Sequence, residues 1–199
     1  MVTIGFSKPY VAKYSNNGTS VTYTGGMDLA RGVKLSLEVK SADENDFYAD
    51  NVISETDSGT FTSGTVKMTV DGLENAAASL IFGLQETESV NVGNQPVAMQ
   101  GYGEASEPPY VGVGCVRKTR MKGIDAWWPF ILPKVKFALA GDEMNTQEKS
   151  IDWQTQELEG TVFRDDTTAK NWKVISAEGM ASEEAAYNVL KAYLGGASA

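Results

Sequence analysis

A strict alternation of apolar and polar residues at positions 33–40 constrains this chain more than any other feature of its sequence. Valine or leucine occupies every odd position, and lysine, serine or glutamate occupies every even one. Successive side chains of a strand point to opposite faces, so a period of two indicates a half-buried strand. Residues 61–70 repeat the pattern less cleanly, with Val66, Met68 and Val70 on one face.

Further strand signals lie on either side of these two segments. Residues 10–14 and 20–24 are rich in β-formers and flank Asn16-Asn17-Gly18. Asn-Gly is a strong hairpin signal because both residues tolerate a positive φ, so a hairpin is expected here. Similar runs predict strands at residues 96–102, 110–116, 151–163 and 172–175.

Polar residues, glycine and proline divide the middle of the chain. Residues 86–96 predict a polar loop, and Gly123 predicts a turn. The apolar stretch 127–139 contains Pro129 and Pro133. Proline cannot donate a hydrogen bond to a neighbouring strand, so this stretch is expected to be an edge strand or a bulged strand rather than a central one.

Two segments have the spacing of helices. After Asp71-Gly72, apolar residues recur at helical spacing as far as Leu84. A second helix is expected between Ser182, a favourable N-cap, and Gly195-Gly196. Its expected apolar face consists of Ala186, Val189, Leu190, Tyr193 and Leu194. Strands, a helix, more strands and a last helix predict an α+β fold, mainly β, dominated by an antiparallel sheet.

The absence of histidine removes many kinds of catalysis. There is no Ser-His-Asp triad, no Cys-His dyad and no histidine metal site. The single cysteine, Cys115, can form neither an internal disulfide nor a cysteine zinc cluster, and we expect it to be a small buried side chain. Catalysis by carboxylates or lysine is not excluded by composition.

Glycine-rich and acidic motifs in the sequence are incomplete. The fragments Gly101-Tyr102-Gly103 and Gly112-Val113-Gly114 do not complete a nucleotide-binding loop, and bulges or close backbone approach explain them better. Residues 43–46 begin like a calcium loop, but Phe47 and Tyr48 stand where a ligand and a glycine are needed.

Paired carboxylates and tryptophans are also weak candidates for catalytic or ligand-binding residues. The pairs Asp142-Glu143 and Asp165-Asp166 are typical of solvated loops, and sequence neighbours rarely converge on one reacting atom. Aromatic residues in strands usually belong to the core, which is the expectation for Trp127, Trp128, Trp153 and Trp172. We therefore expect no catalytic residue, no metal and no cofactor.

Charge is distributed unevenly along the chain. With 17 Lys+Arg and 26 Asp+Glu the net charge is −9, which argues against tight wrapping of nucleic acid. Residues 41–60 contain six of these acids and no basic residue, together with Phe47, Tyr48, Val52 and Ile53. A connection of this length is uncommon and often functional, so it predicts an interaction element.

Four basic residues form one cluster, namely Arg117, Lys118, Arg120 and Lys122. This cluster can bind phosphate, or it can meet an acidic surface such as residues 41–60 of another copy. In an acidic protein we favour the second interpretation.

No membrane segment is evident. Residues 1–15 lack the apolar core of a signal peptide, and the longest apolar run, 126–132, is short and contains Pro129. We expect a soluble chain made in a reducing cytoplasm.

Six segments, taken in order, resemble a known family. They are residues 27–31 (MDLAR), 43–52 (DENDFYADNV), 61–73 (FTSGTVKMTVDGL), 109–116 (PYVGVGCV), 151–160 (IDWQTQELEG) and 183–194 (EEAAYNVLKAYL). Together they resemble the major tail protein, or tail tube subunit, of long-tailed non-contractile bacteriophages. The resemblance extends from about residue 2 to residue 194.

The resemblance implies a non-enzymatic structural protein of the virion. It implies a single domain with a β-sandwich or barrel-like core and a flanking helix, assembled into hexameric rings. The rings stack into a tube whose lumen passes double-stranded viral DNA without specific binding. Tape-measure, tail terminator and tail-tip proteins are the implied partners, and the subunit is made in the bacterial cytoplasm.

The resemblance also assigns roles to segments of this chain. A long loop and the chain ends reach the adjacent ring, which makes residues 41–60 our candidate axial contact, with a solvated flap as the alternative. Part of the negative charge is expected to face the lumen, and residues 5–10 and 195–199 to be flexible before stacking. The candidate contact residues are Asp43, Asp46, Phe47, Tyr48, Asp50, Val52 and Ile53, with Arg117, Lys118, Arg120 and Lys122 as basic partners.

Two other functions are compatible with the sequence. The first is a related tube protein of a contractile phage or secretion apparatus. The second is a hydrolase or lyase using carboxylates such as Asp165 and Asp166, which predicts a deep cleft around them.

Overall fold

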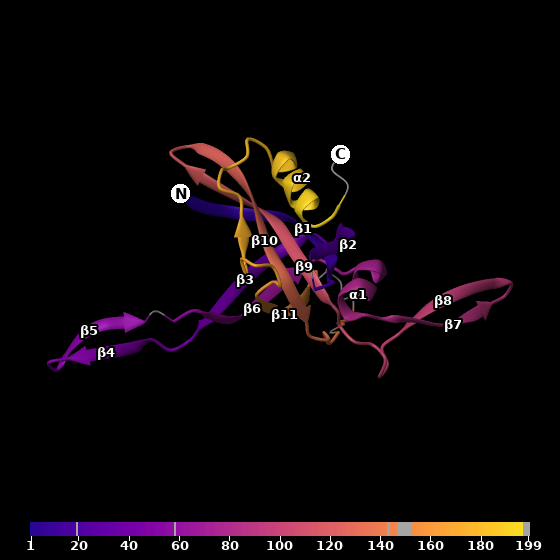
Figure 1. The fold of residues 1–199 in the computed structure, drawn as a ribbon. Helices are drawn as coiled ribbons and strands as arrows, with labels where there is room; N and C mark the ends of the chain where they lie inside the picture. Colours follow the sequence, from indigo (N-terminus) through magenta and orange to yellow (C-terminus); the bar gives the residue numbers. More distant parts are fainter. Residues whose placement is uncertain (19, 58, 143, 147–152, 197–199) are drawn as a thin grey trace.

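A large antiparallel sheet forms the body of the protein in the computed structural model, which describes residues 1–196 except 19, 58, 143 and 147–152. Seven strands of the described chain follow the order β2-β1-β9-β10-β11-β6-β3, and β12 pairs with β10 (Figure 1). Their bounds are Val2–Asn16 (β1), Val21–Asp28 (β2), Gly32–Ser41 (β3), Phe61–Val70 (β6), Tyr110–Met121 (β9), Ile124–Phe137 (β10), Gln156–Phe163 (β11) and Val174–Ile175 (β12). The expected fold class, mainly β with flanking helices, is confirmed.

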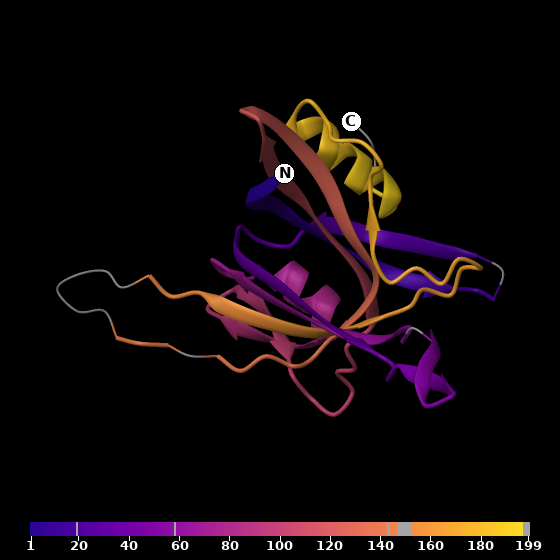
Figure 2. The ribbon, with the colours of Figure 1, turned by 90° about the vertical axis from the view of Figure 1, so that its left-hand side faces the viewer.

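The sheet is strongly curved, so that strands distant in its order meet. Gly32, at the start of β3, lies against the ring of Phe6 in β1. Helix α1 (Asn75–Phe82) packs on the concave side, where Ile81 and Phe82 are buried among side chains of β1, β6, β9, β10 and β11. Figure 2 shows this helix beneath β1. Of the apolar rows predicted from the alternation, Val66, Met68 and Val70 belong to this core, and Leu35 and Leu37 pack against it.

Helix α2 (Glu183–Tyr193) covers the opposite face of β9 and β10. Its N-cap is Ser182, as expected, and the Ser182 hydroxyl accepts a hydrogen bond from the N–H of Ala185 over 3.2 Å. Two glycines of β9 allow the helix to approach: a Cβ on Gly114 would lie 2.9 Å from Leu190 Cδ1, and one on Gly112 would lie 2.7 Å from Leu194 Cδ2. Close approach, rather than nucleotide binding, therefore explains this Gly-Val-Gly fragment.

Strand β10 corrects the expectation of an edge strand, because it lies between β9 and β11. The expected bulge is present, since the register shifts between Leu132 and Val135, around Pro133. Pro129 is tolerated for another reason. Trp127 exchanges both backbone hydrogen bonds with Met180, on the side of β10 that faces away from β9. Backbone groups two residues apart in a strand point to the same side, so the nitrogen of Pro129 also faces this side. There β12 pairs only with Phe130 and Ile131, and the missing N–H of Pro129 therefore interrupts no strand pairing.

Residues 86–96 do not form the polar loop that we expected. They belong to a hairpin of β7 (Gln85–Val92) and β8 (Gln95–Gly101). Its two-residue turn is Gly93-Asn94, with Gly93 at φ 65°. Gly-Asn between alternating valines is a hairpin signal, which the polarity of the segment obscured.

Smaller expectations also need correction. Residues 5–10 are not a flexible end but part of β1, paired with β9. Trp153 is 83% exposed, whereas the other three tryptophans are half-buried. In α2 the buried face includes Tyr187, while Val189 and Tyr193 are exposed. Of the helices in the described residues, none has the length and apolar character needed to cross a membrane.

Candidate assembly surfaces

The acidic segment 41–60 is a projecting hairpin, which we call the acidic hairpin. Strands β4 (Asn45–Ala49) and β5 (Val52–Asp57) pair around a two-residue turn in which Asp50 and Asn51 have φ of 50° and 64°. Positive φ at both turn residues matches the right-handed twist of the strands. The hairpin extends away from the curved sheet (Figure 1). Its apolar residues face solvent, with exposed fractions of 63% for Phe47, 60% for Tyr48, 64% for Val52 and 52% for Ile53.

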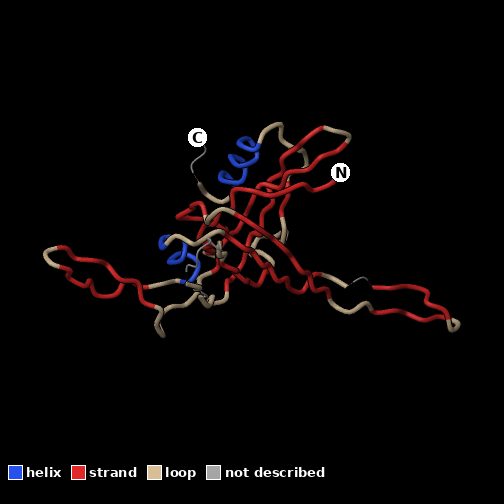
Figure 3. The backbone as a smooth tube through the Cα atoms, turned by 180° about the vertical axis from the view of Figure 1, so that it is seen from behind, coloured by secondary structure: helices blue, strands red, loops and turns tan. Residues whose placement is uncertain are grey.

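The hairpin of β7 and β8 projects in the opposite direction (Figure 3). Val90 lies across from Val97, and alternation places Val92 and Met99 on the same face. All four side chains are about half-exposed. Sequence reasoning missed this apolar face, because it treated the segment as a loop.

Strands β2 and β3 are the two ends of the main sheet and each has one paired neighbour in that order. On β3, Leu35 and Leu37 pack against the core, but Val33 and Val39, at the ends of the same apolar row, are exposed. An unpaired strand edge presents backbone N–H and C=O groups that can pair with another chain.

The predicted basic cluster lies at the end of the β9–β10 hairpin, where the structure provides a partner for two of its members. Asp125 forms ion pairs with Lys118, over 2.8 Å, and with Arg120. The hydrogen bond from Arg120, followed by that from Lys118, lowers the pKa of Asp125. Lys122 occupies the turn with φ 51° and has no ion-pair partner within the described chain.

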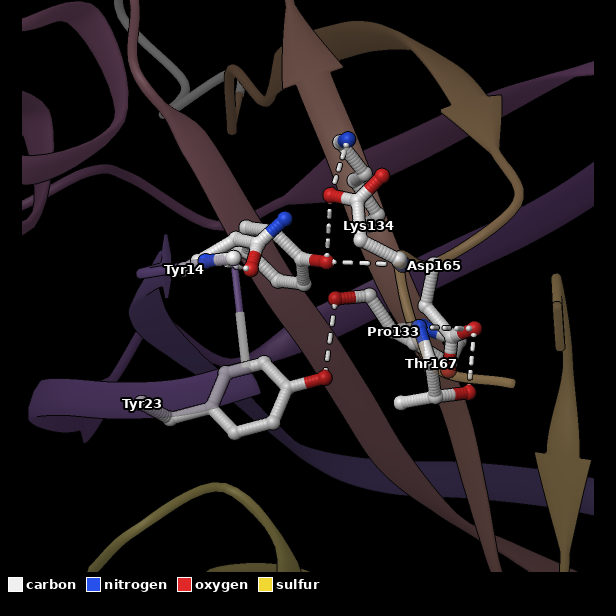
Figure 4. Close-up of polar contacts among 9 residues, drawn as sticks. Tyr14, Tyr23, Pro133, Lys134, Asp165 and Thr167 are labelled. Atoms are coloured by element: carbon white, nitrogen blue, oxygen red, sulfur yellow. Dashed lines mark hydrogen bonds and ion pairs between the residues drawn. The ribbon is translucent and has the colours of Figure 1, made fainter. Parts of the chain in front are cut away.

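The carboxylate pair Asp165-Asp166 is structural rather than convergent (Figure 4). Asp165 is 2% exposed, which corrects the expectation of a solvated loop, and its Oδ1 accepts from Thr167 Oγ1 over 2.7 Å. Asp166 Oδ2 accepts from Tyr14 Oη over 2.8 Å and from Lys134 Nζ over 2.7 Å. Asp166 therefore holds the segment after β11 against β1 and β10, whereas Asp165 bonds within that segment.

The Asp166 contacts make a pH-dependent contribution to stability. The hydrogen bond from Lys134, then that from Tyr14, holds the pKa of Asp166 below its ordinary value of 3.8. A carboxylate with a lowered folded-state pKa stabilises the protein above its unfolded-state pKa, and this contribution disappears as the pH falls through the folded-state value.

We expect Asp166→Asn to lower the free energy of unfolding by about 1–2 kcal/mol at pH 7. The difference from wild type should shrink below about pH 4, as wild-type Asp166 protonates. Urea unfolding at several pH values measures both effects. The exposed Asp43→Asn variant serves as the control and should match wild type throughout. A pH-independent loss in Asp166→Asn would contradict the assignment.

An open cleft of about 780 Å³ lies between β1, the start of β3 and α2, and neither Asp165 nor Asp166 lines it. Both cations that line it are ion-paired, Lys8 with Glu184 over 2.8 Å and Arg31 with Asp71. Among the described residues, no group of His, Cys, Asp or Glu is placed to hold a metal ion. Cys115 is buried, as expected, and burial raises the pKa of its thiol to about 12.

No family model matches this chain, and no curated protein matches its sequence significantly.

Proposed function

We propose that this protein is a structural subunit that self-assembles into stacked rings and so builds a tube of the phage-tail type. The observation that carries the proposal is the pair of projecting hairpins, whose apolar side chains are exposed in the single chain. An isolated two-stranded hairpin is marginally stable in water, and exposed apolar patches mark interaction sites. A second copy is the partner that gives both hairpins a role.

The edges of the main sheet supply a second kind of contact. A head-to-tail contact closes into a ring or continues as a filament, depending on its rotation. A tube needs one contact around the ring and another along the axis. We assign the edges of β2 and β3 that pair with no strand of the described chain to the ring, and the acidic hairpin to the axis. The number of six subunits, the virion as location and the passage of DNA rest on the resemblance of the sequence.

Electrostatics are compatible with passage of DNA. The 26 acids of the chain outnumber its 17 cations, so part of its acidic surface can face a lumen through which the duplex slides. A basic lumen in a solved tube would contradict this part of the proposal.

Negative-stain microscopy of concentrated purified protein tests the proposal directly. We expect rings, or tubes of constant width, whose abundance rises steeply with concentration. Protein that remains monomeric at high concentration, even in the presence of the tail-initiation complex, would refute it.

A further inference from the structure

The end of the sheet at the β9–β10 turn is both basic and apolar, and we call it the basic tip (Figure 1). It comprises the first residues of β1 and the β9–β10 turn, since Val2 pairs with Arg120 and Met121 with Ile124 across that turn. Three apolar side chains are exposed there, with fractions of 46% for Ile4, 57% for Met121 and 74% for Ile124. These side chains therefore present apolar surface to solvent in the single chain.

Charge at the basic tip is opposite to that of the whole chain. Residues 117–125 contain four cations and one carboxylate, although the protein has a net charge of −9. Asp125 is engaged with Lys118 and Arg120, which leaves Lys122 as an exposed cation beside Met121 and Ile124. An apolar patch bordered by cations selects a partner that is apolar and acidic.

The acidic hairpin has this complementary character. It combines four exposed apolar side chains with six carboxylates and no cation between residues 41 and 60. The β7–β8 hairpin is a weaker match, because residues 85–101 include only two acids. Neither the acidic hairpin nor the basic tip is suited to pair with the same surface of another copy, since like charges would then face each other.

We propose that the acidic hairpin of one copy docks on the basic tip of another copy. This inference rests on the proposed self-assembly and names the two surfaces of its axial contact. The two surfaces differ, so the contact is head-to-tail, and each subunit can give one hairpin and receive another. Lys122 and the tip residues Met121 and Ile124 become the receiving surface for Phe47 and Tyr48.

Two variants, each blocked at one surface, test this pairing. Lys122→Glu alters the basic tip and leaves the hairpin intact, whereas Phe47→Asp alters the hairpin and leaves the tip intact. We expect each variant alone to need at least about tenfold more protein than wild type for assembly along the axis. Lys122→Glu places a like charge before the carboxylates of the hairpin. Phe47→Asp removes apolar surface from the contact and requires a carboxylate to lose its water against Met121 and Ile124. Mixed in equal amounts, they should associate through the two intact surfaces and double the mass of the unit that each forms alone.

Lys170→Glu is the matched control for Lys122→Glu. Lys170 is also an exposed lysine in a turn with positive φ, 52° against 51°, so the substitution makes the same change of charge on the same backbone conformation. We expect it to assemble like wild type. Circular dichroism melting checks that all variants are folded, and sedimentation velocity measures mass.

The outcomes separate this pairing from the proposed function. Tubes formed equally by wild type and Lys122→Glu overturn the pairing and leave the tube intact. If the mixed variants associate but wild type forms no tubes, the pairing is supported and the proposed tube function is overturned. Mixed variants that fail to associate, while wild type forms tubes, also overturn the pairing.

Discussion

Replacing Phe47 and Tyr48 together with aspartate is expected to leave the subunit folded and to abolish tube formation. Both rings are more than half exposed in the single chain and neither belongs to the buried clusters. In a docked hairpin the exposed part of each ring would become buried, which is worth about 1–2 kcal/mol per ring. Because 1.4 kcal/mol is a factor of ten in an equilibrium constant, the concentration needed for assembly should rise more than about tenfold.

The expected result has a clear readout and control. Thermal unfolding of the double variant should match wild type, while negative-stain images should lack tubes. The conservative double variant Phe47→Leu, Tyr48→Phe keeps the apolar surface and should still assemble. Tubes formed by the aspartate variant at wild-type concentrations would show that the acidic hairpin is a solvated flap.

Substitution of Gly114 by valine should cause the largest loss of stability among the changes considered. A Cβ at this position would lie 2.9 Å from Leu190 Cδ1 and 3.2 Å from the carbonyl oxygen of Phe130. The helix side chain can shift, but the strand backbone cannot, so α2 must move away from β9. Overpacking of this kind costs about 1–3 kcal/mol, and the loss of helix contacts places the expected value near 3 kcal/mol.

Gly5→Val is the matched control, because Gly5 also lies in a strand but a Cβ there would meet no atom within 4 Å. Urea unfolding should show a normal midpoint for this variant and a lowered one for Gly114→Val. Combining Gly114→Ala with Leu190→Ala should cost less than the sum of the single changes, because the smaller side chain makes room. Additive losses would mean that the two positions do not contact each other.

Local patterns were enough to predict much of the fold. The alternation at residues 33–40 and 61–70 predicted β3 and β6, and Ser182 predicted the start of α2. Local patterns did not predict the position of a strand in the sheet where that position depends on its neighbouring strands. The central position of β10 depends on which strands pair beside Pro129, and sequence spacing does not reveal those partners.

The candidate surfaces were predictable only in part. Exposure of Phe47 and Tyr48 agrees with the expected interaction element, although their contact with another copy remains a prediction. The neutralisation of Lys118 and Arg120 by Asp125 was missed, because it depends on the cross-strand register of β9 and β10. The Gly93-Asn94 turn was visible in the sequence, and the alternating valines beside it would have identified the second hairpin.

In the proposed tube, the acidic hairpin would set the axial repeat independently of the packing of the core. The hairpin joins β3 and β6 through a narrow stem, where the N–H of Ala42 donates to the carbonyl of Thr60 over 2.8 Å. A strand advances about 3.3 Å per residue, so removing two residues from each strand would shorten the hairpin by about 7 Å and preserve which side chains share a face. The spacing between successive rings of such a tube would therefore depend on the number of residue pairs in the hairpin, and this number can change without any adjustment of the core.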